Sequence, residues 1–295
     1  MSNAASSSSA VPGPLQCGRF TLSFERPLVM GILNVTPDSF SDGGRYVARD
    51  EALRQAERMM LDGADLLDIG GESTRPGAPP VPLDEELERV VPLVEALRGA
   101  NVPLSIDTYK PDVMREALAA GADMINDVWG FRMSGAIDAV RDSACGLCVM
   151  HMLGEPRTMQ LGEPAYEDVV TDVRDFLEAR VTALREAGVA QARISVDPGF
   201  GFGKTVIEQN YALLARLTQT APRTTPPMPV LAGMSRKSML GAVTGRAAGE
   251  RLAASVAAAV CAAERGAAII RVHDVAQTVD ALKVWSAMCD AAHRG

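Results

Sequence analysis

The sequence predicts a single (β/α)₈ TIM barrel with a short N-terminal hairpin strand. Eight short apolar runs alternate with helical stretches along 295 residues, and no linker interrupts the alternation. Most of the runs are continuously apolar, which is typical of parallel strands that are covered on both faces. Aromatic residues make up only 4% of the chain, so aliphatic side chains must fill the core. A doubly wound open sheet is the main alternative architecture.

The predicted strands and helices follow one another in regular order. Strands are expected at 27–35, 64–70, 102–108, 122–128, 146–152, 192–199, 229–235 and 267–274. Long helices are expected at 49–63, 83–99, 111–121, 167–188, 249–266 and 274–292, and a short helical turn at 238–243. Several of these helices end in a glycine directly before the next strand, which suits a helix C-terminus.

The beginning of the chain lies outside this alternation. Residues 19–25 (RFTLSFE) are expected to form a hairpin strand that caps the barrel floor. Residues 1–14 have neither a charged n-region nor an apolar h-region, so they are interpreted as a flexible tail and not as a secretory signal. The expected organisation is therefore a tail over 1–14 and one barrel domain over 15–295.

Composition excludes several classes of function. A formal net charge of −8 argues against a nucleic-acid partner, because phosphate backbones favour a basic face. No apolar run is long enough to span a membrane, and a cytoplasmic location is expected. Five scattered cysteines do not suggest a disulfide framework. Cys145 and Cys148 are interpreted as core residues of a strand, because a zinc site would need further ligands nearby.

Polar residues gather where the predicted strands end, which is where barrel enzymes carry their active sites. They are Asn34, Asp107, Asn126, Asp197, Arg271 and His273, together with the loops TPDSFSDGG, GGESTRPGA and SRKS. Each alone could be a helix cap, a turn former or a solvated loop residue. Their coincidence at one rim predicts a functional site there.

Three of these features bear on anion binding. Arg271 and His273 lie two residues apart on a strand, so their side chains share a face. An anion at the barrel mouth would offset the cost of burying them. The SRKS segment (235–238) offers backbone N–H groups to a carboxylate or phosphate, although it could also be a basic solvated loop. The run from Gly199 to Lys204 resembles a phosphate loop but lacks the dinucleotide spacing, so alone it is a weak signal. His151, on an apolar strand, is interpreted as a core histidine.

Seven strings in the sequence resemble the dihydropteroate synthases, a family of pterin-binding barrels. They are GILNVTPDSFSDGG (31–44), DIGGESTRPGA (68–78), IDT (106–108), INDVWG (125–130), DPGFGFGK (197–204), GMSRKS (233–238) and RVHDV (271–275). The resemblance implies a transferase of folate biosynthesis that condenses 6-hydroxymethyl-7,8-dihydropterin pyrophosphate with p-aminobenzoate, giving 7,8-dihydropteroate and pyrophosphate. It also implies Mg²⁺ as cofactor, inhibition by sulfonamides and a homodimer formed through helices of the outer wall.

The resemblance further implies roles for single residues. The catalytic set would be Lys237, Asp107, Arg75 and Asn34. The pterin would be bound by Asp107, Asn126, Asp197, Lys237, Met150 and Gly233. The pyrophosphate would be bound by Asn34, Arg75, Arg271 and His273, with Asn34 also helping to hold Mg²⁺. The p-aminobenzoate would be bound by Thr74, Arg75, Pro76, Phe40, Phe202, Ser235 and Ser238.

Elementary chemistry agrees with these roles. A pterin presents adjacent N–H and NH₂ donors, which a carboxylate accepts in pairs and an amide can complement. The aromatic amine is already neutral near pH 7, so no strong base is needed. We therefore expect a dissociative displacement, in which pyrophosphate leaves before the amine attacks, while loops 36–45 and 71–80 close to exclude water.

Two other functions share part of this pattern. A corrinoid methyltransferase that binds methyltetrahydrofolate would use the same Asp107, Asn126 and Asp197 floor, but it would not need the SRKS and R-x-H elements. A non-catalytic pterin-binding paralogue would be expected to lose a loop or an anion ligand, and no such loss is visible at the motif positions.

Overall fold

A computed structural model describes residues 11–35, 44–73, 79–154 and 165–293. Within these ranges, eight parallel strands form one sheet: β3 (Leu28–Asn34), β4 (Leu66–Gly70), β5 (Leu104–Asp107), β6 (Met124–Asp127), β7 (Gly146–Met150), β8 (Ile194–Asp197), β9 (Leu231–Ala232) and β10 (Ile269–Val272). Their order is β8-β7-β6-β5-β4-β3-β10-β9. A parallel bridge between Val196 in β8 and Val230, next to β9, joins the two ends. The sheet closes into the predicted barrel, so the doubly wound alternative is excluded.

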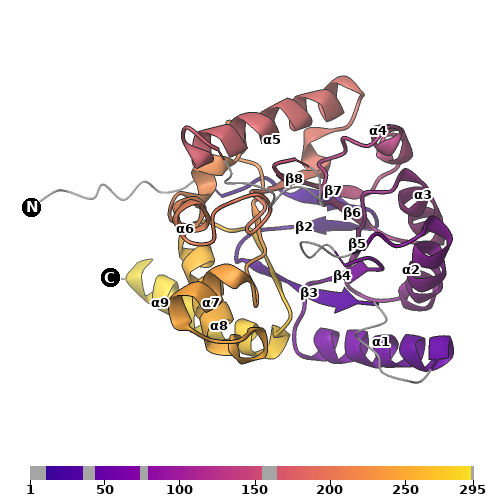
Figure 1. The fold of residues 1–295 in the computed structure, drawn as a ribbon, viewed down its shortest axis with the longest axis horizontal. Coiled ribbons are helices and arrows are strands. Elements are labelled where there is room, and N and C mark those ends of the chain that lie inside the picture. Colours follow the sequence, from indigo (N-terminus) through magenta and orange to yellow (C-terminus); the bar gives the residue numbers. More distant parts are fainter. Residues whose placement is uncertain (1–10, 36–43, 74–78, 155–164, 294–295) are drawn as a thin grey trace, which may run out of the picture.

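Helices surround the strands (Figure 1). The six long helices occur where they are predicted: α1 (Gly44–Leu61), α2 (Leu83–Leu97), α3 (Pro111–Ala120), α5 (Val169–Glu186), α8 (Leu252–Glu264) and α9 (Val275–His293). The predicted turn at 238–243 is the short helix α7 (Ser238–Thr244). Two further helices, α4 (Ala136–Val140) and α6 (Glu208–Ala215), are absent from the prediction, because they are too short to show a clear 3.6-residue pattern.

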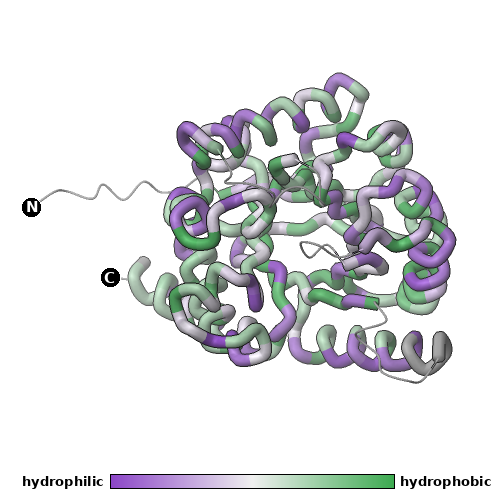
Figure 2. Tube along the Cα trace, in the orientation of Figure 1, coloured by the Kyte–Doolittle hydropathy of each residue, from purple (hydrophilic) through white to green (hydrophobic). Residues whose placement is uncertain are grey.

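Successive residues of each strand pack on opposite faces, which divides the core into two layers. Val29, Leu67, Ile125 and Val149 pack outward against the helices. The inner layer, within the barrel, contains Met30, Leu66, Met124, Cys148, Leu231 and Ile269. Both layers are buried, which explains the continuous apolar runs of the sequence. In Figure 2 the surrounding helices alternate between hydrophilic and hydrophobic segments, as amphipathic covering helices do.

An N-terminal hairpin closes the bottom of the barrel. Its second strand lies within the predicted range 19–25, whereas its first strand lies before that range and was not predicted. Strands β1 (Leu15–Cys17) and β2 (Phe20–Leu22) pair antiparallel, and Leu15 and Cys17 are fully buried in the inner layer. Arg19 holds the hairpin to the barrel through an ion pair of 2.8 Å with Asp123. The chain before the hairpin also contacts the barrel, because the amide of Gly13 donates to the carbonyl oxygen of Pro227 at 3.2 Å.

The cysteines and helices of the described chain agree with the expectations from composition. Cys145 and Cys148 are buried free thiols, and Cys148 lies in β7, so their interpretation as core residues is confirmed. No helix in the described part of the chain has the length and apolar character required to cross a membrane.

Candidate active site

The strand register brings the predicted polar residues together at the carboxyl end of the barrel. Asn34 is paired with Gly70, Gly70 with Asp107, and Asp107 with Asn126, so four adjacent strands end at one level. Across the mouth, Met150 is paired with Asp197 in the same way. The coincidence seen in the sequence is therefore a real cluster in space.

The floor of this cluster is built around Arg271 of β10. Its Nε donates to Oδ2 of Asp68 at 2.5 Å, and its Nη2 donates to Oδ2 of Asp107 at 2.8 Å. Asn126 joins the same carboxylate, because its Nδ2 donates to Oδ2 of Asp68 at 3.1 Å. Asp68 is fully buried, and Asp107 and Asn126 are each 4% exposed. The floor is thus a charged and hydrogen-bonded network inside an otherwise apolar barrel.

Three of the floor side chains each have one oxygen atom without a hydrogen-bond partner in the described structure. Oδ1 of Asp68, Oδ1 of Asp107 and Oδ1 of Asn126 are all buried and have no hydrogen-bond partner among the described residues. A buried acceptor without a donor is costly, and native structures contain few of them. Three such atoms in one network indicate a binding site for a molecule that presents several N–H donors.

Burial and neighbouring charges shift the pKa values at this site. Burial raises the pKa of Asp107 to about 7, although Arg271 acts in the opposite direction. Burial also raises the pKa of Asp197, against the effect of the nearby Lys237. For Lys237, burial lowers the pKa to about 8, while Asp197 opposes that shift. Burial disfavours the charged form of Arg271, but Asp68 and Asp107 outweigh it and raise its pKa.

Lys237 lies at the side of the mouth, directly before α7. Its Nζ donates to the carbonyl oxygen of Phe200 at 2.6 Å and lies 4.7 Å from the centroid of the Phe202 ring. The preceding residue, Arg236, has a φ of 60°, in the left-handed region. This conformation is held by the hydroxyl of Ser255, which accepts from the Arg236 amide at 3.0 Å, and by an ion pair with Asp274.

The predicted anion and p-aminobenzoate residues are distributed over the rim. The amide of His273 donates to Oγ of Ser235 at 3.2 Å, and the ring Nδ1 lies 3.0 Å from the same oxygen. Ser238 is exposed at the first position of α7. Met150 and Phe202 are buried in a small apolar cluster with Val128 and Met152. Phe40, Thr74, Arg75 and Pro76 lie outside the described residues.

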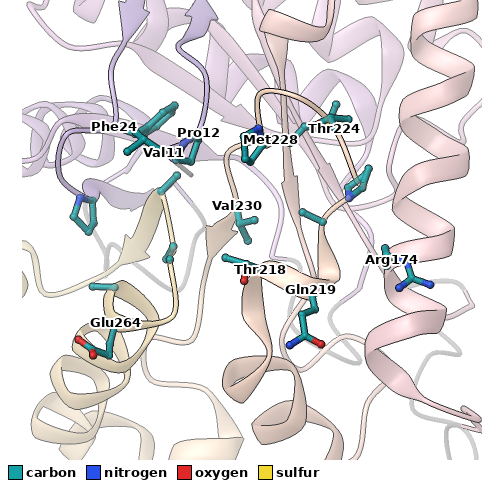
Figure 3. A pocket seen from close by; sticks show the side chains of 18 of the residues that line it. Val11, Pro12, Phe24, Arg174, Thr218, Gln219, Thr224, Met228, Val230 and Glu264 are labelled. Carbon is teal, nitrogen blue, oxygen red and sulfur yellow. The ribbon is translucent and has the colours of Figure 1, made fainter. Parts of the chain in front are cut away.

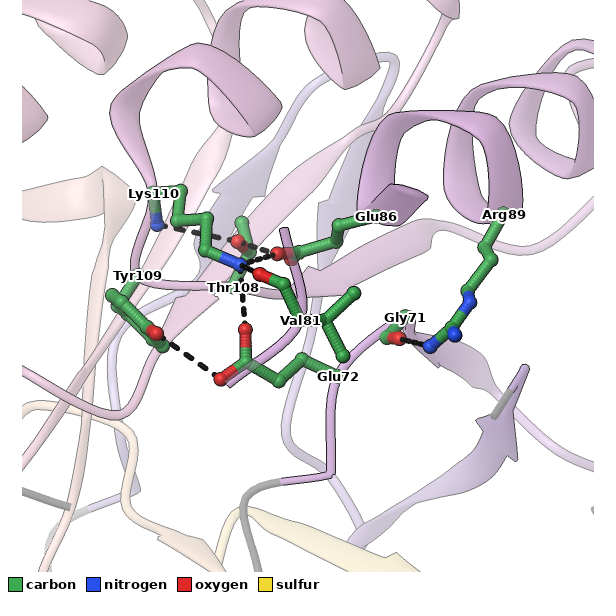
Figure 4. Close-up of polar contacts among 8 residues, drawn as sticks. All are labelled: Gly71, Glu72, Val81, Glu86, Arg89, Thr108, Tyr109 and Lys110. Atoms are coloured by element: carbon green, nitrogen blue, oxygen red, sulfur yellow. Dashed lines mark hydrogen bonds and ion pairs between the residues drawn. The ribbon is translucent and has the colours of Figure 1, made fainter. Parts of the chain in front are cut away.

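A second polar network holds the chain before and after the segment that carries Thr74, Arg75 and Pro76 (Figure 4). Nζ of Lys110 lies 2.6 Å from Oε2 of Glu72 and 2.6 Å from the carbonyl oxygen of Val81, and it also pairs with Glu86. Thr108, next to Asp107, donates to the other Glu86 oxygen at 2.7 Å. Lys110 therefore ties both ends of that segment to the end of β5.

Sequence reasoning missed two residues of this region. Asp68 forms the centre of the floor, and the available signal was a carboxylate within the apolar run LLDIG, at the same strand face as Gly70. Lys204 was considered only as part of a weak glycine-rich pattern, yet it is 5% exposed and makes several hydrogen bonds.

In a large cleft at the opposite end of the barrel, none of the described lining residues has a buried side-chain polar atom without a partner. Its volume is about 950 Å³, and its lining includes Phe24, Met228, Val230 and Ala268, which lie just before strands begin (Figure 3). Charged residues such as Arg174 and Glu264 stand at its margin and not in a converging set. The carboxyl end of the barrel is therefore the candidate active site.

Comparison with known proteins gives a consistent result. Residues 30–273 match the family model described as "Pterin binding enzyme". The chain is 46% identical over 272 residues to the dihydropteroate synthase of Escherichia coli (strain K12), covering 92% of this chain and 95% of that protein. It is also similar to the crystal structure of Burkholderia cenocepacia dihydropteroate synthase complexed with 7,8-dihydropteroate, at 72% identity and a TM-score of 0.91 over 97% of this chain and 99% of that chain.

A third similar structure is the Yersinia pestis dihydropteroate synthase in a sulfonamide drug complex. The identity is 47% and the TM-score 0.87, and the match covers 94% of this chain and all of the other (100%). The similarity thus extends over the barrel and both of its ends.

Proposed function

The chain belongs to the dihydropteroate synthase family of pterin-binding enzymes, and from this premise we propose how its own residues carry out the reaction of that family. The reaction is a transfer: p-aminobenzoate displaces pyrophosphate from 6-hydroxymethyl-7,8-dihydropterin pyrophosphate, which gives 7,8-dihydropteroate. The observation that carries the proposal is the set of unpartnered acceptor oxygens on the floor of the barrel.

The floor suits a pterin ring. Oδ1 of Asp107, Oδ1 of Asn126 and Oδ1 of Asp68 are acceptors, and the edge of a pterin offers N–H and NH₂ donors to such atoms. A ring without these donors would leave the same oxygens buried and unpaired, so the floor selects against it. Asp197 and Lys237, with Met150 and Gly233 beside them, would complete the pterin site from the other side of the barrel.

The pyrophosphate would lie above the floor, at the rim. His273 and Arg75 are proposed to bind it, with Nη1 of Arg271, since Nε and Nη2 of Arg271 are already engaged by Asp68 and Asp107. Cationic donors in a closed site stabilise the charge that develops on a departing pyrophosphate. This stabilisation lowers the barrier to cleavage of the bond between the pterin methylene carbon and the pyrophosphate oxygen.

Magnesium is proposed to bind beside Asn34. A Cβ built on Gly70, the residue paired with Asn34, would lie 3.5 Å from Oδ1 of Asn34, so glycine at this position leaves the amide oxygen uncovered. Amide, phosphate and water oxygens are ligands that Mg²⁺ accepts. When bound, the ion offsets the negative charge of the pyrophosphate.

The second substrate would enter beside Lys237. Phe202, Ser235 and Ser238 are proposed to bind p-aminobenzoate, together with Phe40 and the segment from Thr74 to Pro76. The amine of p-aminobenzoate attacks the pterin methylene carbon after pyrophosphate has left, and no side chain needs to act as a strong base. A similar protein has been crystallised in a sulfonamide drug complex, and we propose that sulfonamides compete with p-aminobenzoate for this site.

We further propose a cytoplasmic homodimer. α7, α8 and α9 carry exposed apolar side chains, namely Val243, Leu252, Val284 and Met288. These helices lie together in Figure 1, and a second copy of the chain would cover them. The free thiols of all five cysteines suit a reducing compartment.

A turnover assay, a pterin-binding assay and a methyl-transfer assay separate this function from its alternatives. Purified protein with the pterin pyrophosphate, p-aminobenzoate and Mg²⁺ should release dihydropteroate and pyrophosphate in equal amounts. Tight pterin binding without turnover would instead indicate a non-catalytic paralogue. Methyl transfer from methyltetrahydrofolate to a corrinoid protein, without dihydropteroate formation, would indicate the methyltransferase.

A further inference from the structure

The glycine-rich loop that follows β8 is held by a buried lysine, Lys204. Its Nζ lies 2.7 Å from the carbonyl oxygen of Gly199, 3.1 Å from that of Phe202 and 2.9 Å from Nδ1 of His151. An ammonium group has three N–H donors, enough for these three acceptors, and a fourth, the carbonyl oxygen of His151, lies 3.5 Å away. Lys204 therefore connects two points of the loop to the end of β7.

His151 takes part in this contact through Nδ1 of its ring. Its ring is 4% exposed and packs edge-on against Phe176, with ring centroids 4.8 Å apart. Burial, and then the charge of Lys204, lowers the pKa of His151 to about 2, so the ring stays neutral. Burial lowers the pKa of Lys204 well below its ordinary value. In its charged form Lys204 can only donate to Nδ1, which places the ring proton on Nε2. This residue is thus a satisfied core histidine, as the sequence suggested.

The opposite face of the same loop contacts Lys237. Nζ of Lys237 donates to the carbonyl oxygen of Phe200 at 2.6 Å and stands 4.7 Å from the centre of the Phe202 ring. The loop lies between two lysines, with Lys204 behind it and Lys237 at the mouth. A displacement of the loop backbone would move both partners of Lys237 together.

The loop also fits closely against the chain after β7. Gly199 has a φ of +69°, and a Cβ there would lie 1.9 Å from the carbonyl oxygen of His151. A Cβ on Gly203 would lie 2.6 Å from Cβ of Leu153, and the hydroxyl of Tyr166 donates to the Gly203 oxygen at 2.8 Å. Glycine lets the two backbones approach, and Lys204 supplies the hydrogen bonds that hold them in register.

We propose that Lys204 is a positioning residue for the second substrate: by holding the loop, it keeps the Phe202 ring and the Phe200 carbonyl where they hold the Lys237 ammonium beside p-aminobenzoate. The inference rests on the proposed function, which places that substrate next to Phe202 and Lys237. Most of the pterin floor (Asp68, Asp107, Asn126 and Arg271) lies on β4, β5, β6 and β10, away from the loop; only Asp197 and Lys237 of the pterin site adjoin it, so pterin binding should be affected less.

The test compares Lys204→Met with Lys204→Gln, which retains an N–H donor. Lys283→Met, which changes an exposed side chain remote from the loop, is the control. For Lys204→Met we expect the KM for p-aminobenzoate to rise about tenfold or more, with a change of less than about threefold in the KM for the pterin substrate. Lys204→Gln should give an intermediate rise, and Lys283→Met should match the wild type. A loss of stability with both KM values unchanged would overturn the proposal, because it would show a purely structural role.

The ¹⁵N spectrum of the His151 ring gives an independent readout, with His151→Gln used for assignment. The wild type should show a neutral ring with Nδ1 unprotonated between pH 5 and 8, as expected of a buried acceptor. Protonation at Nδ1 would contradict donation by Lys204. If the wild-type protein has no synthase activity, the proposed function fails, and the spectrum still shows whether Nδ1 of His151 is the acceptor in the contact with Lys204.

Discussion

Nε of Arg271 lies 2.5 Å from Oδ2 of Asp68, although the two residues are 203 positions apart in the chain. The contact joins β10 to β4 across β3 and places a buried cation between two carboxylates, because Asp107 accepts from the same guanidinium at 2.8 Å. The second oxygens of both carboxylates have no partner in the described structure. The contact between Arg271 and Asp68 therefore fixes the shape of the floor, while the free oxygens of Asp68 and Asp107 can accept hydrogen bonds from a ligand.

Removal of the Asp68 charge should weaken both the fold and pterin binding. Asp68→Asn keeps the size but leaves Arg271 with one carboxylate, and breaking a buried pair typically costs about 3 kcal/mol or more. We expect that loss in urea unfolding, together with a fall of about 100-fold in kcat/KM for the pterin substrate. The control is Asp112→Asn, which removes an exposed ion pair with Arg115 and should cost about 1 kcal/mol or less. If the two variants lost the same free energy of unfolding and the same kcat/KM, the role given to Asp68 would be refuted.

Pterin binding should depend on the ionisation of Asp107. Burial raises the pKa of this carboxyl to about 7 in the free protein, so it is largely protonated below that pH. A ligand that donates to the ionised carboxylate must lower this pKa, so binding should strengthen as pH rises through 7 and should release a proton. Calorimetry at pH 6.5 in buffers of different ionisation enthalpy measures this release, with a pterin that lacks phosphate groups. Asp107→Asn should abolish it, and equal release from that variant would assign the proton to another group.

Lys110 should contribute strongly to stability. Its ammonium pairs with Glu72 and with Glu86, which is 1% exposed, so Lys110→Met would leave a buried carboxylate without its cation. We expect a loss of about 3 kcal/mol in the free energy of unfolding, against about 0.5 kcal/mol or less for the exposed Lys283→Met. A thermal or urea denaturation series would measure both, and a small loss in Lys110→Met would mean that solvent replaces the lysine.

The hairpin cap should not tolerate a side chain at Gly18. Gly18 has a φ of +56°, and a Cβ there would lie 2.6 Å from Oδ1 of Asp123. Gly18→Ala combines backbone strain with displacement of the carboxylate that binds Arg19, so we expect a loss of about 2 kcal/mol or more. Gly99→Ala, where no atom lies within 4 Å of the added Cβ, is the matched control and should be close to neutral. If the two variants had similar unfolding midpoints, the hairpin would accommodate the added methyl group without a loss of stability.

The barrel and much of the site could be predicted because each depends on local pattern. Continuous apolar runs mark the strands, and parallel strands bring their carboxyl ends to one level, so Asn34, Asp107 and Asn126 had to meet. Asp68 was missed because its role is created by Arg271, and no local pattern reveals a partner at that distance. Lys204 was missed because the path of the loop, and with it the contact to His151, is set by tertiary packing.

The most direct test of the account is a crystal structure of this protein with a bound pterin. The account predicts that the N–H edge of the ring donates to Oδ1 of Asp107 and Oδ1 of Asn126, at the carboxyl end of the barrel, with Arg271 still paired to Asp68. A pterin bound elsewhere, such as in the cleft at the opposite end, with the floor oxygens still without donors, would contradict it.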